Sequence, residues 1–446
     1  MPGDDPVPAD STAALWRAAE HLSAHPWIAA AEVAGNAVRL VPARAALAVR
    51  PEPGALLTEH LDQWSEVYDW TYSQASGRHA DDLDLSGWRA SDTGEPFPVE
   101  HMKDWLRHTV ELVLRDKPRR VLELGCGTGM LMHRLHPHVD AYVGTDVAAD
   151  AVRKLSTSAP GGAVIVQASA HEAPSAVVQD AIAAAFAGAR PDCVLLNSVT
   201  QCFPSVEYLR AVVQDAIDVV APGGIVIVGD VRHAGLLRDH HRWLDATATD
   251  AELDERVDRD EELLFDAPLL ASLAAEAGRE VRMATFAKTM CADTELTRYR
   301  FDAVLHVDPG TPAVAPTVIR WPDLPSSNRI TALRARLDGS PARVARIPNQ
   351  LVNTEAGTTA AELHHAIGDL DAVVCLDPAD PRFLEVIAPA MSAARPVQEI
   401  SGPGKAHEPL RGFVRRRLAE VARRELRRGG HTLVPITIDL GEHHAC

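Results

Sequence analysis

Short apolar runs alternate with amphipathic stretches through the middle of the chain. The runs are rich in aliphatic and β-branched side chains, and the stretches between them repeat apolar positions at helical spacing. This alternation predicts an α/β fold with a mostly parallel sheet and helices on both faces. Two later runs, Glu280–Phe286 and Phe301–Val307, predict an antiparallel hairpin at one edge. The five earlier predicted strands are Val121–Leu124, Ala141–Thr145, Val164–Gln167, Asp192–Leu196 and Ile225–Gly229.

Two helical stretches precede these strands. The first, Leu56–Tyr72, places Tyr68 and Tyr72 four residues apart on one face. This spacing fits aromatic core packing, and it equally fits a lid over a bound ligand. The second helix begins at Pro98. The turn-rich loop ahead of it carries Trp88, which we expect to touch a ligand.

The first strand breaks into a glycine-rich turn, VLELGCGTGM. Gly125, Gly127 and Gly129 permit a sharp turn and a close approach of the backbone to a ligand. Asp146 ends the next strand, where an acid receives ribose hydroxyls in a Rossmann-like fold. The glycine spacing departs from that of a dinucleotide site, and Glu123 suits a cationic ligand without a pyrophosphate. We therefore expect S-adenosylmethionine, with a degenerate nucleotide site as the alternative.

Polar clusters follow the third, fourth and fifth strands. They are ASAH at 168–171, NSVTQ at 197–201 and GDVRH at 229–233. Each alone is typical of a helix N-cap. Because ligands bind at the carboxyl edge of parallel strands, three clusters beside the glycine turn favour a ligand site.

Length, charge and cysteine content narrow the classes of function. A chain of 446 residues is expected to form two or three units. A net charge of -18 argues against nucleic acid and against an anionic membrane surface. No apolar run reaches about 18 residues, so we expect no membrane span and a cytoplasmic protein. The six cysteines have no paired spacing, which predicts neither disulfides nor a zinc site.

The last third of the chain has a looser pattern. Residues 309–400 mix predicted helices and strands, and a glycine- and proline-rich linker follows. Leu410–Arg428 is a predicted helix dense in arginine. It is interpreted either as a solvated face or as a contact for RNA or a carrier protein.

Several motifs between Trp64 and Val307 together resemble a known family. They are QWSEVYDWTY, SGWRASDTGEPFPVEHMKDWL, RRVLELGCGTGMLMHRL, YVGTDVA, LLNSVTQCFPSVEYL, APGGIVIVGDVR and ELTRYRFDAVLHV. The region resembles the N-methyltransferase domains of non-ribosomal peptide synthetases. This resemblance implies a Rossmann-like, seven-stranded S-adenosylmethionine-dependent methyltransferase sheet with a helical N-terminal lid.

Both ends of the chain resemble parts of the host domain in those synthetases. HLSAHPWIAAAEVAGNAVRLVP and LRGFVRRRLAEVARRELRRGGHTLVP look like two halves of the C-terminal subdomain of an adenylation domain. The resemblance implies a freestanding methyltransferase with a small α+β region formed by the two termini. The implied divisions are 1–55 and 401–446 for the two remnants, 56–308 for the methyltransferase and lid, and 309–400 for an appended α/β region.

The resemblance also implies roles for individual residues. Three groups are expected, around the cofactor, the acceptor and the reacting proton. The cofactor set is Tyr68, Tyr72, Trp88, Glu123, Gly125, Gly127, Gly129, Asp146, Ser169, Ala170 and Asn197. The acceptor set is Gln201, Arg232 and Arg298. Asp230 is the first candidate for the base, followed by His233 and His241.

The expected reaction is transfer of a methyl group from S-adenosylmethionine, with S-adenosylhomocysteine as the product. The expected acceptor is the amine of an amino acid or a derived intermediate, free or bound to a carrier protein. Alternatives are an O- or C-methyltransferase on a small metabolite and a catalytically silent partner subunit. A homodimer is conceivable, and no metal site is expected, because no histidine spacing matches a metalloenzyme motif.

Overall fold

The computed structural model describes residues 9–74, 83–312, 314–353, 357–400, 402 and 404–441. The chain divides into two compact units. The smaller unit comprises Met1–Trp64, Asp258–Glu261 and Glu408–Cys446, and the larger comprises Ser65–Val257 and Glu262–His407. Each unit has its own sheet, so each is described by itself.

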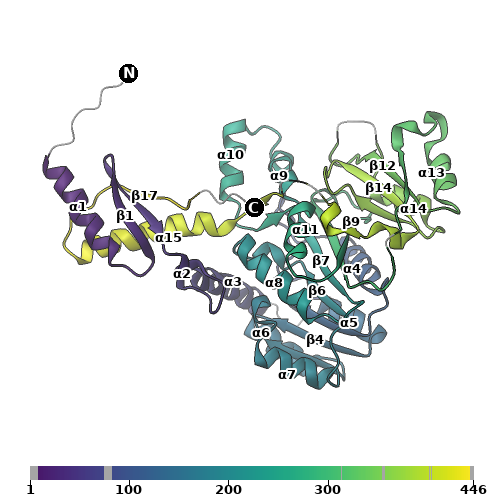
Figure 1. Ribbon diagram of the computed structural model, residues 1–446, viewed down its shortest axis with the longest axis horizontal. Coiled ribbons are helices and arrows are strands. Elements are labelled where there is room, and N and C mark those ends of the chain that lie inside the picture. Colours follow the sequence, from purple (N-terminus) through teal and green to yellow (C-terminus); the bar gives the residue numbers. More distant parts are fainter. Residues whose placement is uncertain are drawn as a thin grey trace. The chain divides into compact units, whose positions relative to one another are not determined.

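The larger unit is built on one sheet (Figure 1). Its central strands run in the order β5-β4-β3-β6-β7-β10-β9, and only β10 is antiparallel to the others. The predicted seven-stranded Rossmann-like sheet is therefore confirmed. The strands are β3 (Arg120–Leu124), β4 (Ala141–Asp146), β5 (Ala163–Gln167), β6 (Cys193–Asn197), β7 (Ile225–Arg232), β9 (Val281–Ala287) and β10 (Arg300–Val307).

The sheet continues beyond β9. Four more strands extend it, and β15 (Arg395–Pro396) also pairs with β9. The prediction that β9 and β10 lie at an edge was wrong, because β13 and β15 occupy the backbone groups of β9 that an edge strand would leave free. Residues 309–400 thus add strands to the sheet of the methyltransferase. These strands are β13 (Val373–Leu376), β14 (Phe383–Ala388), β12 (Ala342–Pro348) and β11 (Thr317–Arg320).

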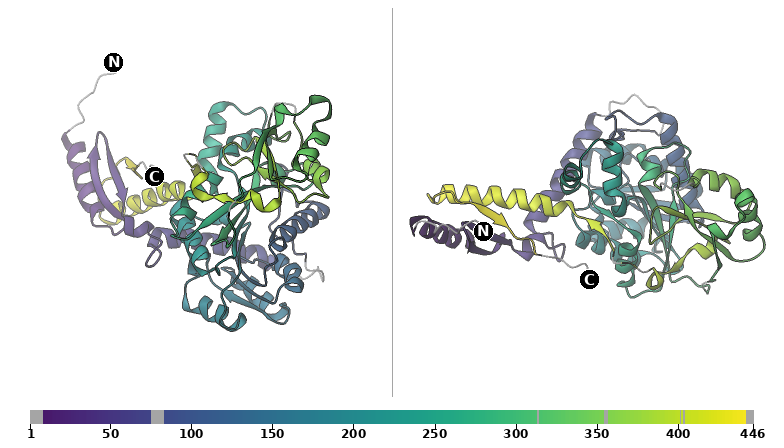
Figure 2. Two further views of the ribbon diagram at one scale, coloured as in Figure 1. Left: turned by 45° about the vertical axis from the view of Figure 1, so that its right-hand side comes forward. Right: turned by 90° about the horizontal axis from the view of Figure 1, so that it is seen from above.

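Helices cover both faces of this sheet (Figures 1 and 2). Because side chains alternate along a strand, Val121 belongs to the core cluster with Trp105 of α4, whereas the buried Leu122 points to the opposite face. The α-helices of this unit after α3 (Ala55–Gln74) are α4 (Val99–Leu114), α5 (Met130–Leu135), α6 (Ala149–Ser158), α7 (Ala176–Ala185), α8 (Val206–Val219), α9 (Leu237–Leu244), α10 (Asp250–Arg259), α11 (Ala267–Ala275), α12 (Glu295–Arg298), α13 (Arg329–Leu337) and α14 (Ala360–Ile367). Two short strands, β8 (Leu264–Phe265) and β16 (Ala406–His407), pair with each other.

The smaller unit joins the two ends of the chain. The strand β17 (Ile436–Ile438) pairs in parallel with β2 (Ala37–Pro42), which pairs with β1 (Ile28–Ala34). The helices α1 (Ala9–Ser23) and α15 (Pro409–Arg428) contribute to one apolar cluster with this sheet. The expected small α+β region formed by the two termini is confirmed. The unit also contains α2 (Arg44–Leu47) and the first half of α3 (Ala55–Gln74).

Leu418 tests how this unit is held together. Its side chain is fully buried in the cluster that α1 and α15 share. We expect Leu418→Ala to destabilise the unit by about 2 to 5 kcal/mol, since it leaves a cavity. Hydrogen exchange of the α1 and β2 amides measures the effect locally.

The matched control is Leu433→Ala, since Leu433 is 54% exposed. In this variant, the opening free energy derived from the same exchange rates should change by less than about 0.5 kcal/mol. Equal protection in both variants would show that the cluster contributes little to the unit.

Candidate active site

The glycine turn links β3 to α5. Gly125, Gly127 and Gly129 have φ values of 85°, 52° and 80°, a region that L-residues rarely adopt. A Cβ on Gly125 would lie 2.6 Å from Cγ2 of Val199, and one on Gly129 would lie 2.6 Å from Cδ2 of Leu155. The turn therefore requires glycine for both conformation and space.

Asp146, at the end of β4, holds this turn in place. Its Oδ2 accepts a hydrogen bond from the Gly127 amide at 2.7 Å, and its Oδ1 accepts one from the Ala148 amide at 2.9 Å. Burial raises the pKa of the carboxyl group. The residue predicted to bind a ribose thus lies directly against the glycine turn and shapes it.

Glu123 lies inside the core below the turn. It is 2% exposed, and it accepts a hydrogen bond from the hydroxyl of Tyr142. Burial raises its pKa to about 7, with the nearby charge of Asp146 adding to the effect. Its carboxyl group is therefore partly protonated near neutral pH.

The two tyrosines of α3 lie beside the turn. A Cβ on Gly127 would lie 3.0 Å from the hydroxyl oxygen of Tyr72, so this hydroxyl covers the middle glycine. The hydroxyl of Tyr68 lies 3.2 Å from Sγ of Cys202. Trp88 packs on Trp105, with ring centroids 4.6 Å apart, beside the core cluster. The structure thus brings the tyrosines to the turn and places Trp88 against the core.

The clusters after β5 and β6 differ in character. Ser169 precedes the 3-10 turn Ala170–Glu172, and its amide donates to Glu172 at 2.7 Å, which is a capping arrangement. Asn197 is buried at the end of β6, and its Oδ1 has no hydrogen-bond partner among the described residues. Oε1 of Gln201 is also a buried atom, and it too has no hydrogen-bond partner among the residues that the structure describes. Both oxygens are thus buried acceptors without a hydrogen bond in the described residues, which is uncommon in folded proteins.

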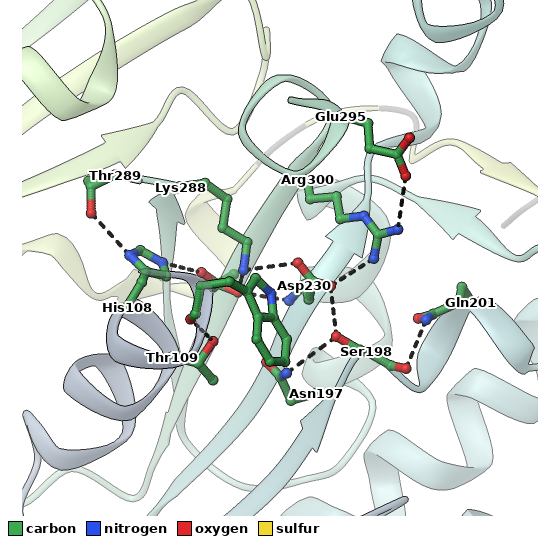
Figure 3. A network of polar contacts seen from close by, with 12 residues as sticks. His108, Thr109, Asn197, Ser198, Gln201, Asp230, Lys288, Thr289, Glu295 and Arg300 are labelled. Atoms are coloured by element: carbon green, nitrogen blue, oxygen red, sulfur yellow. Dashed lines mark hydrogen bonds and ion pairs between the residues drawn. The ribbon is translucent and has the colours of Figure 1, made fainter. Parts of the chain in front are cut away.

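A buried charge network lies where β7, β9 and β10 meet (Figure 3). Nζ of Lys288 lies 2.6 Å from Oδ1 of Asp302 and 3.2 Å from Oδ1 of Asp230. Nη1 of Arg300 donates to Oδ2 of Asp230 at 2.7 Å. His108 of α4 contacts Asp302 at 2.9 Å. Two carboxylates and two cations therefore balance within the protein interior.

Asp230 is poorly suited to the role of a base. It is fully buried, and its pKa lies well below its usual range because Arg300 and Lys288 outweigh the effect of desolvation. It also accepts a hydrogen bond from Ser198 Oγ at 2.7 Å. A carboxylate held by two cations and a hydroxyl takes up a proton reluctantly. The geometry favours a structural role, in which Asp230 fixes the end of β7.

The two predicted histidines lie in the segment that follows β7. Nδ1 of His233 accepts a hydrogen bond from the Gly235 amide, and burial lowers its pKa to about 4. His233 also lines a small cavity with Lys288, Arg298 and Asn349, which has room for about one water molecule. His241 lies on α9, with its ring 5.6 Å from that of His240.

The predicted acceptor arginines are engaged in ion pairs. Arg298 donates to Asp293 through Nε and Nη2 at 2.5 and 2.6 Å, so it is tied to its own loop. Arg232 donates to Oε2 of Glu262 at 2.7 Å. The structure therefore joins Arg232 to a glutamate that the sequence did not single out.

Sequence reasoning missed several charged residues of this region. They are Lys288, Glu262, Glu295, Arg300 and Asp302. One signal was available, because Arg300 and Asp302 alternate on a strand whose other residues are apolar except for His306. Ionic side chains in such a run indicate buried partners. Glu262 had no such signal, since it lies in an acidic stretch, DRDEEL, that is typical of a solvated surface.

The described residues hold no group of three or more histidine, cysteine, aspartate or glutamate side chains arranged for a metal ion. Cysteines 126, 193, 202, 291 and 375 are free, and Cys446 lies outside the described residues. Within the described ranges, no helix combines the length and the apolar character needed to cross a membrane.

Glu123 generates a prediction about pH. Its pKa is raised from 4.5 to about 7, so between these values the unfolded chain loses the proton while the folded chain keeps it. The folded state therefore loses stability as pH rises through this window, by about 3 kcal/mol in total. Glu123→Gln should remove this loss, because its amide oxygen still accepts from Tyr142 and cannot ionise.

Urea unfolding at pH 5, 6, 7 and 8 provides the measurement. The free energies of unfolding of the two proteins should diverge as pH rises, with the variant more stable at pH 8. Parallel curves would show that Glu123 is not the titrating group.

Lys288 generates a prediction about stability. Its replacement in Lys288→Met leaves two buried carboxylates with one cation, which should cost about 3 to 5 kcal/mol. The control is Lys103→Met, since Lys103 pairs with Glu100 at the surface and its side chain is 55% exposed. That variant should change stability by less than about 1 kcal/mol. Equal unfolding midpoints for the two variants would contradict the importance of the network.

The sequence comparisons agree with this site. Residues 99–282 match a protein family described as a methyltransferase domain. CymA of Salinispora arenicola, a probable nonribosomal peptide synthetase, is 36% identical over 296 residues, covering 65% of this chain and 4% of the relative. Chondramide synthase of Chondromyces crocatus is 32% identical over 284 residues, covering 61% and 7%. The chain thus spans less than a tenth of the length of these relatives.

Among solved structures, the N-methyltransferase NodS of Bradyrhizobium japonicum in complex with S-adenosyl-L-homocysteine is 13% identical. The match covers 56% of this chain and 98% of that chain, with a TM-score of 0.35. A likeness this distant supports no functional argument. The family match, the resemblance to the synthetases and the glycine turn agree with one another. Residues 99–282 match a methyltransferase domain, and the chain is similar to a part of CymA, a probable nonribosomal peptide synthetase.

Proposed function

We propose that the chain methylates the amine of an amino acid or an amino-acid-derived intermediate in natural-product biosynthesis. The observation that carries this proposal is its similarity to proteins named as nonribosomal peptide synthetases. Peptide synthesis consumes amino acids, which offer an amine to a methyl donor. The acceptor is either free or bound to a carrier protein. The charge at the predicted acceptor end supports an amine, because Arg300 there faces the carboxylates of Asp230, Glu262 and Glu295.

The residues around the glycine turn fit the cofactor. The three glycines hold the turn in a conformation that other residues rarely adopt, and Asp146 accepts a hydrogen bond from the middle amide of the turn. S-adenosylmethionine supplies a methyl group bound to a sulfonium sulfur. When the methyl group is transferred, this sulfur becomes a neutral thioether and is the leaving group. The protein then has to orient the acceptor in line with the methyl group and exclude water. We assign this cover to Tyr68 and Tyr72 of α3, and the position of the Tyr72 hydroxyl beside Gly127 supports the assignment.

Direct binding and turnover measurements test the proposal. Calorimetric titration should show binding of S-adenosylmethionine and S-adenosylhomocysteine. Mass spectrometry of amine, hydroxyl and carbon acceptors should then show a mass gain of one methylene on amines. Methylation of oxygen or carbon acceptors alone would refute an N-methyltransferase, and binding without turnover of any acceptor would favour the silent partner subunit.

Asp146 provides a variant for the cofactor site. Asp146→Ala removes the acceptor for the Gly127 amide and the predicted ribose contact, so affinity for S-adenosylmethionine should fall by about tenfold or more. The control is Asp140→Ala, since Asp140 pairs with Arg119 at the surface and its side chain is 56% exposed. Calorimetry should find its affinity unchanged, and equal affinities in the two variants would place the cofactor elsewhere.

A further inference from the structure

Glu262 lies next to the turn that follows β6. The amide of Leu263, the next residue, donates to the carbonyl of Gln201 at 2.8 Å. This contact fixes the segment ahead of β8 against the short 3-10 helix Thr200–Cys202. The same turn contains Val199, which packs on Gly125. One short segment therefore touches the glycine turn at Val199 and, at Gln201, the residue that follows Glu262.

The carboxylate of Glu262 is held from the other side by β7. Nη1 of Arg232 donates to its Oε2 at 2.7 Å, and Nη2 of Arg232 lies 3.3 Å from Nδ1 of His240. The side chain of Arg232 is only 10% exposed. A buried, doubly contacted arginine restricts the position of the glutamate, because the guanidinium is rigid and permanently charged.

Glu262 also faces the aromatic side of the site. The Cys202 sulfur and burial raise the pKa of Tyr68, burial raises the pKa of the Cys202 thiol, and the charge of Glu262 adds a smaller effect in the same direction to both. The two groups lie 3.2 Å apart. Tyr68 lies four residues before Tyr72, whose hydroxyl covers Gly127. The carboxylate is thus within electrostatic reach of the same α3 face that borders the glycine turn.

Exposure separates Glu262 from the neighbouring carboxylates. Asp230 is fully buried between Lys288 and Arg300, and Glu295 has an 8% exposed side chain that accepts from the Ser91 amide. The side chain of Glu262 is 32% exposed. Of these three carboxylates around Arg300, Glu262 is therefore the one that an arriving ligand can reach.

We propose that Glu262 is the residue that binds the amine of the acceptor and receives its proton, with Arg232 as its positioning residue. The inference rests on the proposed function and names the recognition group of the same site. An N–H of the acceptor donates to the carboxylate, which directs the nitrogen lone pair toward the methyl group. The ligand class is a primary or secondary amine.

The chemical step balances with groups that the proposal names. The nitrogen lone pair forms the new N–C bond while the C–S bond breaks and its electron pair goes to sulfur. The nitrogen becomes cationic, and the negative charge of Glu262 stabilises it. The N–H proton then passes to the carboxylate and on to water, which its exposed oxygen reaches.

The test uses the full chain and three variants. Glu262→Gln keeps an oxygen for Arg232 and removes the charge, Glu262→Asp keeps the charge, and Glu261→Gln is the matched control. The side chain of Glu261 is 76% exposed, and Glu261 precedes Glu262 directly. Thermal unfolding establishes that each variant is folded. Titration establishes that each variant binds S-adenosylhomocysteine with unchanged affinity.

Two readouts separate binding of the amine from its methylation. The probes are N-acetylcysteamine thioesters of the standard amino acids, which carry a free α-amine. Calorimetry of the protein loaded with S-adenosylhomocysteine measures binding, and mass spectrometry with S-adenosylmethionine measures turnover. We expect Glu262→Gln to weaken binding of the best probe about tenfold and to lower kcat about a hundredfold. Glu262→Asp should recover part of both, and Glu261→Gln should match the unmodified chain.

The outcomes distinguish the two proposals. Turnover of an amine that survives in Glu262→Gln with unchanged kcat and KM would overturn the role of Glu262 while supporting N-methylation. Glutamate-dependent binding of the amine without its methylation would refute the proposed function and support the amine site. Absence of amine binding in the unmodified chain would overturn both.

Discussion

A buried lysine governs the geometry of the acceptor end. Lys288 is fully buried between Asp230 and Asp302, and it is the one cation that contacts both of these carboxylates among the ion pairs of the described residues. The pairings fix side chains from β7, β10 and the residue that follows β9 at one point. Ser198 joins the same point through its hydroxyl. The positive φ values of Ser198 and Asp230, 54° and 60°, occur where this network holds the backbone.

The sheet could be predicted from the sequence because its signal is local. Each strand is specified by an apolar run of a few consecutive residues. The turn is specified by three glycines within five residues, because its positive φ values and close contacts require glycine. The charge network could not be predicted, because Lys288 lies 58 residues from Asp230 along the chain. An aspartate that ends a strand beside a cofactor turn has the sequence pattern of a base. Only the long-range pairing shows that two cations hold it as a permanent carboxylate.

Asp146 shows how one carboxylate serves two requirements. Each of its oxygens accepts one backbone amide, from Gly127 and from Ala148. An ionised carboxylate has about four lone-pair sites, so these amides do not use its full capacity as an acceptor. The contacts in the structure and the ribose role implied by the resemblance are therefore compatible. Holding the turn also explains why the acid must follow β4, since the Gly127 amide lies at that end of the strand.

Burial explains why neighbouring carboxylates differ in what they can do. Asp230 and Glu262 both face Arg300, and the charge of the guanidinium acts on both. The first is enclosed, so any proton it received would have no path to water and would break two ion pairs. The second pairs with Arg232 and keeps a third of its side-chain surface exposed, so an arriving ligand can reach it. In a chain with 62 acidic residues, an acid alone is a weak indicator of catalysis. A carboxylate fixed by a buried arginine and still open to solvent is a more selective criterion, and Glu262 meets it.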